Sequence, residues 1–174
     1  MQALGFLLEL APTRAENFQQ TETFLNVPVH PDARRLLACW RECTACGGFV
    51  VGRDVPSRRL AKLLGNLSLY EYCGRSDDFR VRLAGFSLMR RFGRDITGRL
   101  LREVMPREDH ASHCAALLSV LETGVPFSLD VKKRSPERPL MHFEILALRA
   151  TASDGCTALL LSGQFYFERT GRHR

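Results

Sequence analysis

The stretch that decides the fold is LMHFEILALRATASDGCTALLLSGQFYF, residues 140–167. It holds two long apolar-rich runs, 140–150 and 157–167, whose apolar residues would occupy both faces of a β-strand. Between the runs, Ser153-Asp154-Gly155 has the composition of a tight turn. The stretch therefore predicts two antiparallel strands joined by a turn.

The first of these strands is apolar on both faces. One face carries Phe143, Ile145 and Ala147, and the other carries Leu146 and Leu148. A sheet that is apolar on both faces has to be covered on both sides. We expect one cover to be the longest helix of the chain, and the other to be an N-terminal helix or a partner molecule.

The rest of the sequence supplies the remaining elements. Alternating residues predict a third strand at 127–133 and a hairpin with strands at 67–72 and 79–83. Helical spacing predicts five helices, at 31–43, 57–64, 87–92, 100–105 and 108–122. Two strands, a helical crossover and three antiparallel strands make an α+β fold.

This order of elements, together with several short sequence motifs, resembles the PAS domain. Thr97-Gly98-Arg99-Leu100-Leu101, then MPREDH at 105–110 and LETGVPF at 121–127, are similar to the PAS run through the connecting helix. RFGRDITG at 91–98 and FRVRLAG at 79–85 resemble a narrower family of small, stand-alone bacterial PAS proteins of mostly unknown function. The resemblance implies a five-stranded antiparallel sheet with a helical crossover over a small pocket, preceded by an N-terminal helical extension.

The domain organisation follows from this reading. We expect a weakly structured leader at 1–28, the helical extension at 29–65 and the PAS-like domain at 66–168. The resemblance implies a sensory, signalling or protein-interaction module that binds a small ligand or a protein partner, with no catalytic residue. No Walker loop, Gly-x-Ser-x-Gly or His-Glu-x-x-His word is present in the sequence, which agrees with a protein that is not an enzyme.

Two sets of residues are candidates for binding. An arginine at the mouth of the pocket could pair with a carboxylate ligand, although Asp95 could equally serve to cap the turn to Thr97. The predicted pocket residues are Met89, Phe92, Phe143, Ile145 and Arg94. The predicted interface of a homodimer is the apolar stripe of the N-terminal helix, formed by Leu36, Leu37 and Trp40.

The alternative is a haem- or metal-binding PAS sensor that uses His110 or His113. These residues lie three apart on the long predicted helix, and some PAS domains hold haem through a histidine on this helix. The competing expectation is that His110 is solvated near the start of the helix and that His113 faces water. Asp77-Asp78 is likewise expected to be a solvated pair in a turn.

Cys39, Cys43 and Cys46 match the spacing of the iron–sulfur motif of radical S-adenosylmethionine enzymes. Because Cys39 and Cys43 continue a predicted helix rather than a loop, we expect packed thiols and no metal there. No cofactor is required by the sequence.

The net charge of +6 comes from 22 arginines and 3 lysines that are dispersed along the chain. Dispersed charge argues against a nucleic-acid surface, which usually shows a clustered basic stripe. No run approaches the roughly 20 apolar residues of a spanning helix. We therefore expect a cytoplasmic protein with no membrane partner.

Overall fold

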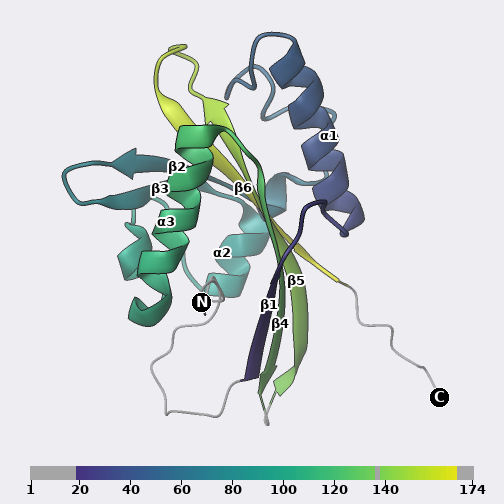
Figure 1. Ribbon diagram of the computed structural model, residues 1–174, viewed down its shortest axis with the longest axis vertical. Coiled ribbons are helices and arrows are strands. Elements are labelled where there is room, and N and C mark those ends of the chain that lie inside the picture. The colour runs from purple at the N-terminus through teal and green to yellow at the C-terminus, as the bar shows by residue number, and fades with distance from the viewer. Residues whose placement is uncertain (1–18, 136–137, 168–174) are drawn as a thin grey trace.

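A single antiparallel sheet is the centre of the fold (Figure 1). The structure, a computed structural model, describes residues 19–135 and 138–167. The strands are arranged in the order β1-β4-β5-β6-β2-β3. Their bounds are Gln19–Phe24 (β1), Leu67–Cys73 (β2), Asp78–Ala84 (β3), Phe127–Ser135 (β4), Arg138–Thr151 (β5) and Ala158–Tyr166 (β6). The α+β fold and the five strands expected from the sequence are confirmed, and β1 is added to them.

Strand β1 lies inside the segment that was expected to be a weakly structured leader. It pairs with β4, with Gln20 opposite Lys133 and Phe24 opposite Leu129. Its sequence, QQTETF, is polar, and the strand forms because the outer edge of β4 offers unpaired backbone groups. The sheet therefore has six strands rather than five, and only residues 1–18 of the predicted leader lie outside the described residues.

Helices cover both faces of the sheet, as its two apolar faces require (Figure 1). Helix α1 (Pro31–Ala45) packs on Leu146 and Leu148. Helices α2 (Phe86–Phe92) and α3 (Arg107–Thr123) lie on the opposite side, where Phe143, Ile145 and Ala147 are buried. The assignment of these five side chains to two faces is confirmed.

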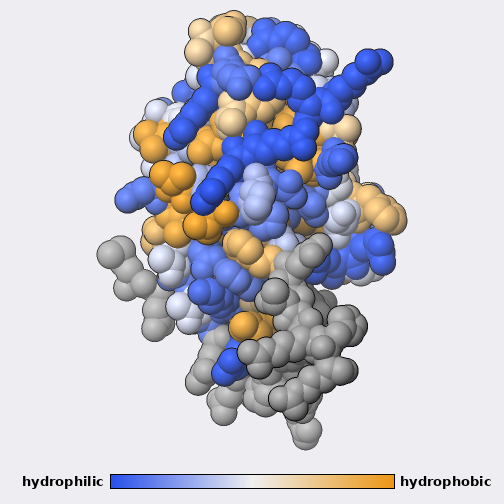
Figure 2. Space-filling view, turned by 90° about the vertical axis from the view of Figure 1, so that its right-hand side faces the viewer, coloured by the Kyte–Doolittle hydropathy of each residue, from blue (hydrophilic) through white to orange (hydrophobic). Residues whose placement is uncertain are grey.

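The N-terminal helix begins where the sequence predicts. Pro31 occupies its first turn, and the side chain of the preceding His30 accepts a hydrogen bond from the amide of Asp32 at 3.1 Å. The indole of Trp40 donates to the carbonyl of Arg149 on β5 at 2.6 Å. Leu36, Leu37 and Trp40 are therefore part of the chain's own core, and the outward side of α1 is largely hydrophilic (Figure 2).

The short helices of the sequence prediction are only partly present. Residues 57–63 form successive turns, closed by bonds such as Leu60 N–H to the Ser57 carbonyl at 3.1 Å and Leu63 N–H to the Leu60 carbonyl at 2.8 Å. A 3₁₀ turn, η1 (Leu64–Asn66), follows. The α-helix predicted at 57–64 is thus wrong, because the three-residue spacing of Leu60 and Leu63 also suits tighter turns. The predicted turn at 100–105 is a 3₁₀ helix, η2 (Leu101–Glu103).

Within the described ranges, the structure contains no helix that is both long and apolar enough to cross a membrane.

Candidate functional site

Four of the five predicted pocket residues lie on the side of the sheet that α2 and α3 cover, two of them on β5 and two on α2. Phe143 and Ile145 are buried on β5, and Phe92 at the end of α2 packs against them. Met89 packs with Phe92 into the neighbouring cluster. Arg94 is exposed and donates to the backbone carbonyl of Glu103 at 3.0 Å. Their role in ligand binding stays a prediction.

In the loop after α2, Asp95 caps the turn to Thr97, which is the structural alternative expected from the sequence. The carboxylate of Asp95 accepts a hydrogen bond from the Thr97 amide at 2.8 Å. The RFGRDITG word therefore has a structural function in shaping this loop.

The same side of the sheet holds a group of buried polar atoms without hydrogen-bond partners. Among the described residues, six buried side-chain atoms are unpartnered, and five of them belong to α3 or to this face. The five are Gln20 Oε1, Asp109 Oδ2, His113 Nε2, Gln164 Nε2 and Tyr166 Oη. Since buried polar atoms in folded proteins are almost always paired, their concentration here points to a place for a hydrogen-bonding molecule. We call these five residues the polar layer.

The register of the strands explains how the polar layer meets the apolar residues. Tyr166 lies opposite Phe143, and Gln164 lies opposite Ile145, in the β5–β6 pair. Cross-strand partners project to the same face of a sheet. The polar layer therefore lies next to the apolar side chains of Phe143 and Ile145. The sequence alone did not indicate it, because Gln164 and Tyr166 lie within a mostly apolar strand.

Burial dominates the electrostatics of the polar layer. His113 is 2 % exposed, and burial lowers its pKa to about 4, so its imidazole is neutral at pH 7. Burial raises the pKa of Asp109, and it lowers the pKa of Lys133 to about 8. The expectation that His113 faces water is wrong, because α3 is rotated so that this residue points at the sheet.

A surface hollow adjoins the polar layer. Its volume is about 370 Å³, and Ser87, Arg90 and Arg91 of α2 line it. The guanidinium of Arg91 lies over the ring of Tyr166, 3.3 Å from its centroid. Volumes of this size suit a small molecule, and two arginines at the opening favour an anionic group.

A second cluster lies between the start of β3 and the part of α3 next to the polar layer, where Asp78 meets His110 and Cys114. The Oδ1 atom of Asp78 is 2.9 Å from Nε2 of His110 and 3.5 Å from Sγ of Cys114. The Cys114 sulfur is 3.3 Å from the same His110 nitrogen. Residues 110 and 114 are one helical turn apart, so α3 presents both of them to the carboxylate.

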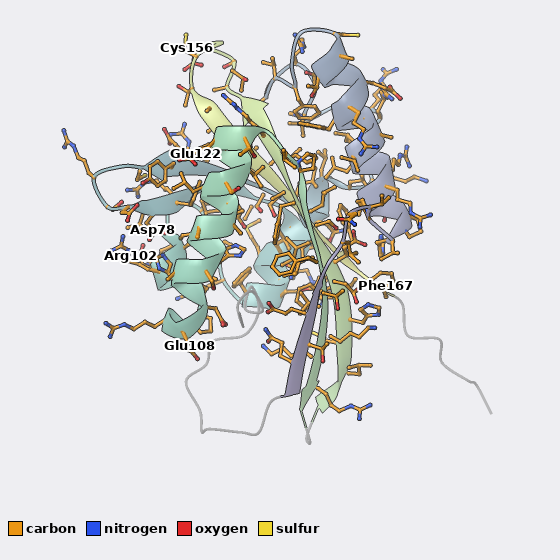
Figure 3. All side chains as sticks on the ribbon, viewed as in Figure 1. Asp78, Arg102, Glu108, Glu122, Cys156 and Phe167 are labelled. Atoms are coloured by element: carbon orange, nitrogen blue, oxygen red, sulfur yellow. The ribbon has the colours of Figure 1, made fainter. Side chains whose placement is uncertain are left out.

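The second oxygen of Asp78 is held by Arg102. The Nε atom of Arg102 donates to Oδ2 at 2.7 Å (Figure 3). Burial alone would raise the pKa of Asp78, but hydrogen bonds from Arg102 and His110 outweigh it and hold that pKa below its ordinary value. Burial next to this carboxylate raises the pKa of Cys114 to about 12.

The expectation of a solvated Asp77-Asp78 pair is wrong for Asp78, which is 0 % exposed. His110 is mostly buried rather than solvated, with 19 % of its side chain exposed. Both differences have one cause: α3 crosses the hairpin at this point and covers the carboxylate. Over the described part of the chain, these three residues are the one group of at least three histidine, cysteine or acidic side chains whose metal-binding atoms lie within 4.8 Å of one another.

The cysteines at 39, 43 and 46 do not form such a group. Cys39 is buried against the sheet and belongs to the core around Trp40, whereas Cys46 is exposed at the end of α1. Burial raises the pKa of Cys43 to about 11. Cys39 and Cys43 thus agree with packed thiols on a helix, whereas the exposed Cys46 does not.

Residues 29–163 match the family model described as a PAS domain. The match runs from the residues just before α1 into β6, and it includes the whole Asp78 cluster but, of the polar layer, only Asp109 and His113. The curated proteins include none that matches this sequence.

Proposed function

The chain belongs to the PAS domain family, and from this premise we propose that it senses a small amphipathic molecule bound between α3 and the sheet, without catalysing a reaction on it. PAS domains are sensory or interaction modules, which is the coarse function of this chain. The proposal adds the place and the chemistry of the ligand. The narrower likeness to stand-alone bacterial proteins, the cytoplasmic location and the homodimer stay predictions.

The observation that carries the proposal is the polar layer. A fold that left five buried polar atoms without partners would lose stability at each of them, by roughly 1–3 kcal/mol per atom. A ligand that forms hydrogen bonds with these atoms removes that cost. The buried polar atoms of the layer are therefore expected to gain hydrogen bonds, and the fold to gain stability, when such a molecule is bound.

The atoms of the layer define the kind of ligand. Asp109 and Gln20 offer acceptors, Gln164 offers a donor, and the hydroxyl of Tyr166 can do either. The apolar side chains next to the layer favour an aromatic or aliphatic body. The arginines beside the hollow favour a carboxylate or a similar anionic group. The ligand class is thus a small carboxylic acid with an apolar body and further hydrogen-bonding groups.

The signal would leave through packing. His113 and Asp109 are on α3, whereas Gln164 and Tyr166 are on β6, so a ligand that bonds to both elements fixes their relative position. A change in the position of α3 alters the surface that it offers to a protein partner. Population shift between the two positions is sufficient to transmit the signal.

Native mass spectrometry of the freshly purified protein, followed by thermal melts with a series of aryl and medium-chain carboxylic acids, tests the proposal. A ligand at one hundred times its Kd stabilises the fold by about 2.7 kcal/mol, which corresponds to about 5–10 °C in Tm. If the protein carries no bound molecule and no acid in the series raises Tm, the proposal is wrong.

A double variant separates the polar layer from a merely structural role. His113→Leu with Gln164→Leu removes two unpartnered atoms and keeps an apolar interior. We expect this variant to be at least as stable as the parent without ligand, and to lose ligand retention. Arg91→Gln is expected to weaken binding of carboxylates more than Arg94→Gln, because Arg94 is engaged with the Glu103 carbonyl.

The haem alternative through His110 or His113 stays a prediction with a simple readout. A Soret band in the freshly purified protein would favour haem over the proposed ligand. A band lost in His113→Leu but kept in His110→Leu would identify the polar layer as the haem pocket.

A further inference from the structure

The Asp78 cluster combines three different metal-binding groups at one point. A carboxylate, an imidazole and a thiol meet there, and their donor atoms all lie within 4.8 Å of one another. Imidazole and thiolate ligands select zinc and related transition metals over the hard cations calcium and magnesium. The donor set therefore points to a transition metal.

The distances within the cluster fit a tetrahedral ion. With Zn–O and Zn–N bonds of about 2.0 Å and a Zn–S bond of about 2.3 Å, tetrahedral angles place oxygen and nitrogen about 3.3 Å apart and sulfur about 3.5 Å from each. The corresponding separations are 2.9 Å for Asp78 Oδ1 to His110 Nε2, 3.5 Å for Oδ1 to Cys114 Sγ and 3.3 Å for Nε2 to Sγ. Each differs from the tetrahedral value by no more than about 0.4 Å, so small side-chain shifts would admit the ion.

The surroundings hold the carboxylate in place. The Nε atom of Arg102 bonds to Oδ2 of Asp78, and the amide of Phe79 donates to Oδ1 at 2.7 Å. Arg102 also donates to the carbonyl of Ser76 in the hairpin turn. Such outer contacts orient the ligands of metal sites and raise their affinity.

We propose that Asp78, His110 and Cys114 bind one transition-metal ion, with Zn²⁺ as the best match, at the joint between α3 and the β2–β3 hairpin. Three protein ligands leave a fourth position of the tetrahedron for water or an exchangeable group. The ion would fasten the start of α3 to the hairpin, on the part of the helix about 100° around its axis from Asp109 and His113 of the polar layer. The metal site does not rest on the proposed ligand, since either can exist without the other.

Cobalt substitution tests the site directly. Tag-free, reduced protein is freed of metal with a chelator and titrated with Co²⁺, whose tetrahedral thiolate complexes show strong visible bands and an ultraviolet sulfur-to-metal charge-transfer band. We expect one Co²⁺ per chain with both features, and displacement of Co²⁺ by Zn²⁺. An absent charge-transfer band at saturating Co²⁺ would overturn the proposal.

Matched variants identify the ligands. Cys114→Ser is expected to lose the charge-transfer band, and both Cys114→Ser and His110→Asn are expected to weaken binding at least a hundredfold, with circular dichroism confirming that they fold. Arg102→Gln is expected to weaken binding about tenfold to a hundredfold, as loss of an outer contact does. The control is Cys156→Ser, which removes an exposed thiol remote from Asp78 and should leave the titration unchanged (Figure 3). A band that survives in Cys114→Ser but disappears in Cys43→Ser or Cys46→Ser would place the metal on α1 and overturn the proposal.

Discussion

Replacing Glu144 by leucine is expected to loosen the attachment of α1 to the sheet. Glu144 is 0 % exposed on the α1 side of β5. One of its oxygens accepts from the backbone amides of Val29 at 3.0 Å and His30 at 2.7 Å, and the other accepts from the Ser128 hydroxyl at 2.7 Å. Because His30 is the N-cap of α1, this carboxylate fixes the point where the helix begins.

The size of the effect follows from the three donors. Each buried donor that loses its acceptor costs about 1–3 kcal/mol, and the two amides near the surface recover part of this by binding water. Glu144→Leu is therefore expected to lower the free energy of unfolding by about 3–5 kcal/mol. Glu144→Gln is expected to cost only about 1 kcal/mol. Its amide oxygen can still accept from both backbone amides, and its NH₂ group can donate to Ser128.

Urea unfolding measures both variants. Trp40 is the single tryptophan of the chain and packs on the sheet, so its fluorescence reports the docking of α1, while far-ultraviolet circular dichroism reports the whole fold. In Glu144→Leu we expect the fluorescence transition to move to lower urea by at least as much as the circular dichroism transition. Glu42→Gln, on the exposed side of α1, is the control. The reasoning fails if leucine at position 144 is tolerated as well as glutamine.

Three further predictions concern pH, backbone packing and assembly. The pKa of His113 falls from 6.5 to about 4 on folding, so below pH 6.5 the unfolded chain binds a proton that the folded chain excludes. The free energy of unfolding should therefore drop by about 3 kcal/mol between pH 6.5 and 4. Thermal melts of His113→Gln, with chelator present, should show a smaller drop. Gly85→Ala should destabilise the fold by more than about 2 kcal/mol, because its Cβ would meet the backbone of Leu64 and Gly65. Gly74→Ala should change the unfolding midpoint little, because its Cβ would make only an ordinary van der Waals contact with the Tyr72 side chain at 3.9 Å. A homodimer should appear in sedimentation equilibrium at high protein concentration, and a strictly monomeric profile would contradict that prediction.

The sequence predicts those strands whose own pattern of apolar residues indicates a strand. Strand β5 is apolar on both faces around residues 143–148, and the two-sided distribution of Phe143 and Leu146 sufficed to predict covers on both faces. Strand β1 carries no such signal, since QQTETF is polar and is strand only because β4 lies beside it. The α-helix predicted at 57–64 was wrong for a different reason. Its leucine spacing fits both an α-helix and tighter turns, and packing selects the tighter turns.

The candidate sites were harder to predict because each depends on the rotation of α3 about its own axis. A leucine stripe predicts which side of that helix faces the core, but Leu117 and Val120 are buried together with His113, so the buried arc is wider than the stripe. The same rotation turns His110 and Cys114 toward Asp78, which lies more than thirty residues earlier in the chain. No local pattern around a carboxylate in a turn indicates that a distant helix will bury it.

One helix therefore carries both groups of polar residues, and this has a consequence for how the domain would work. Asp109 and His113 point to the polar layer, while His110 and Cys114 meet Asp78 at the hairpin. A ligand in the polar layer and an ion in the Asp78 cluster would both restrain α3, which is one rigid element. Two binding events that fix one element are coupled in free energy, and the coupling is reciprocal. Helix α3 is for this reason the element whose position would convert an occupied site into a changed surface, whichever of the two sites is filled first.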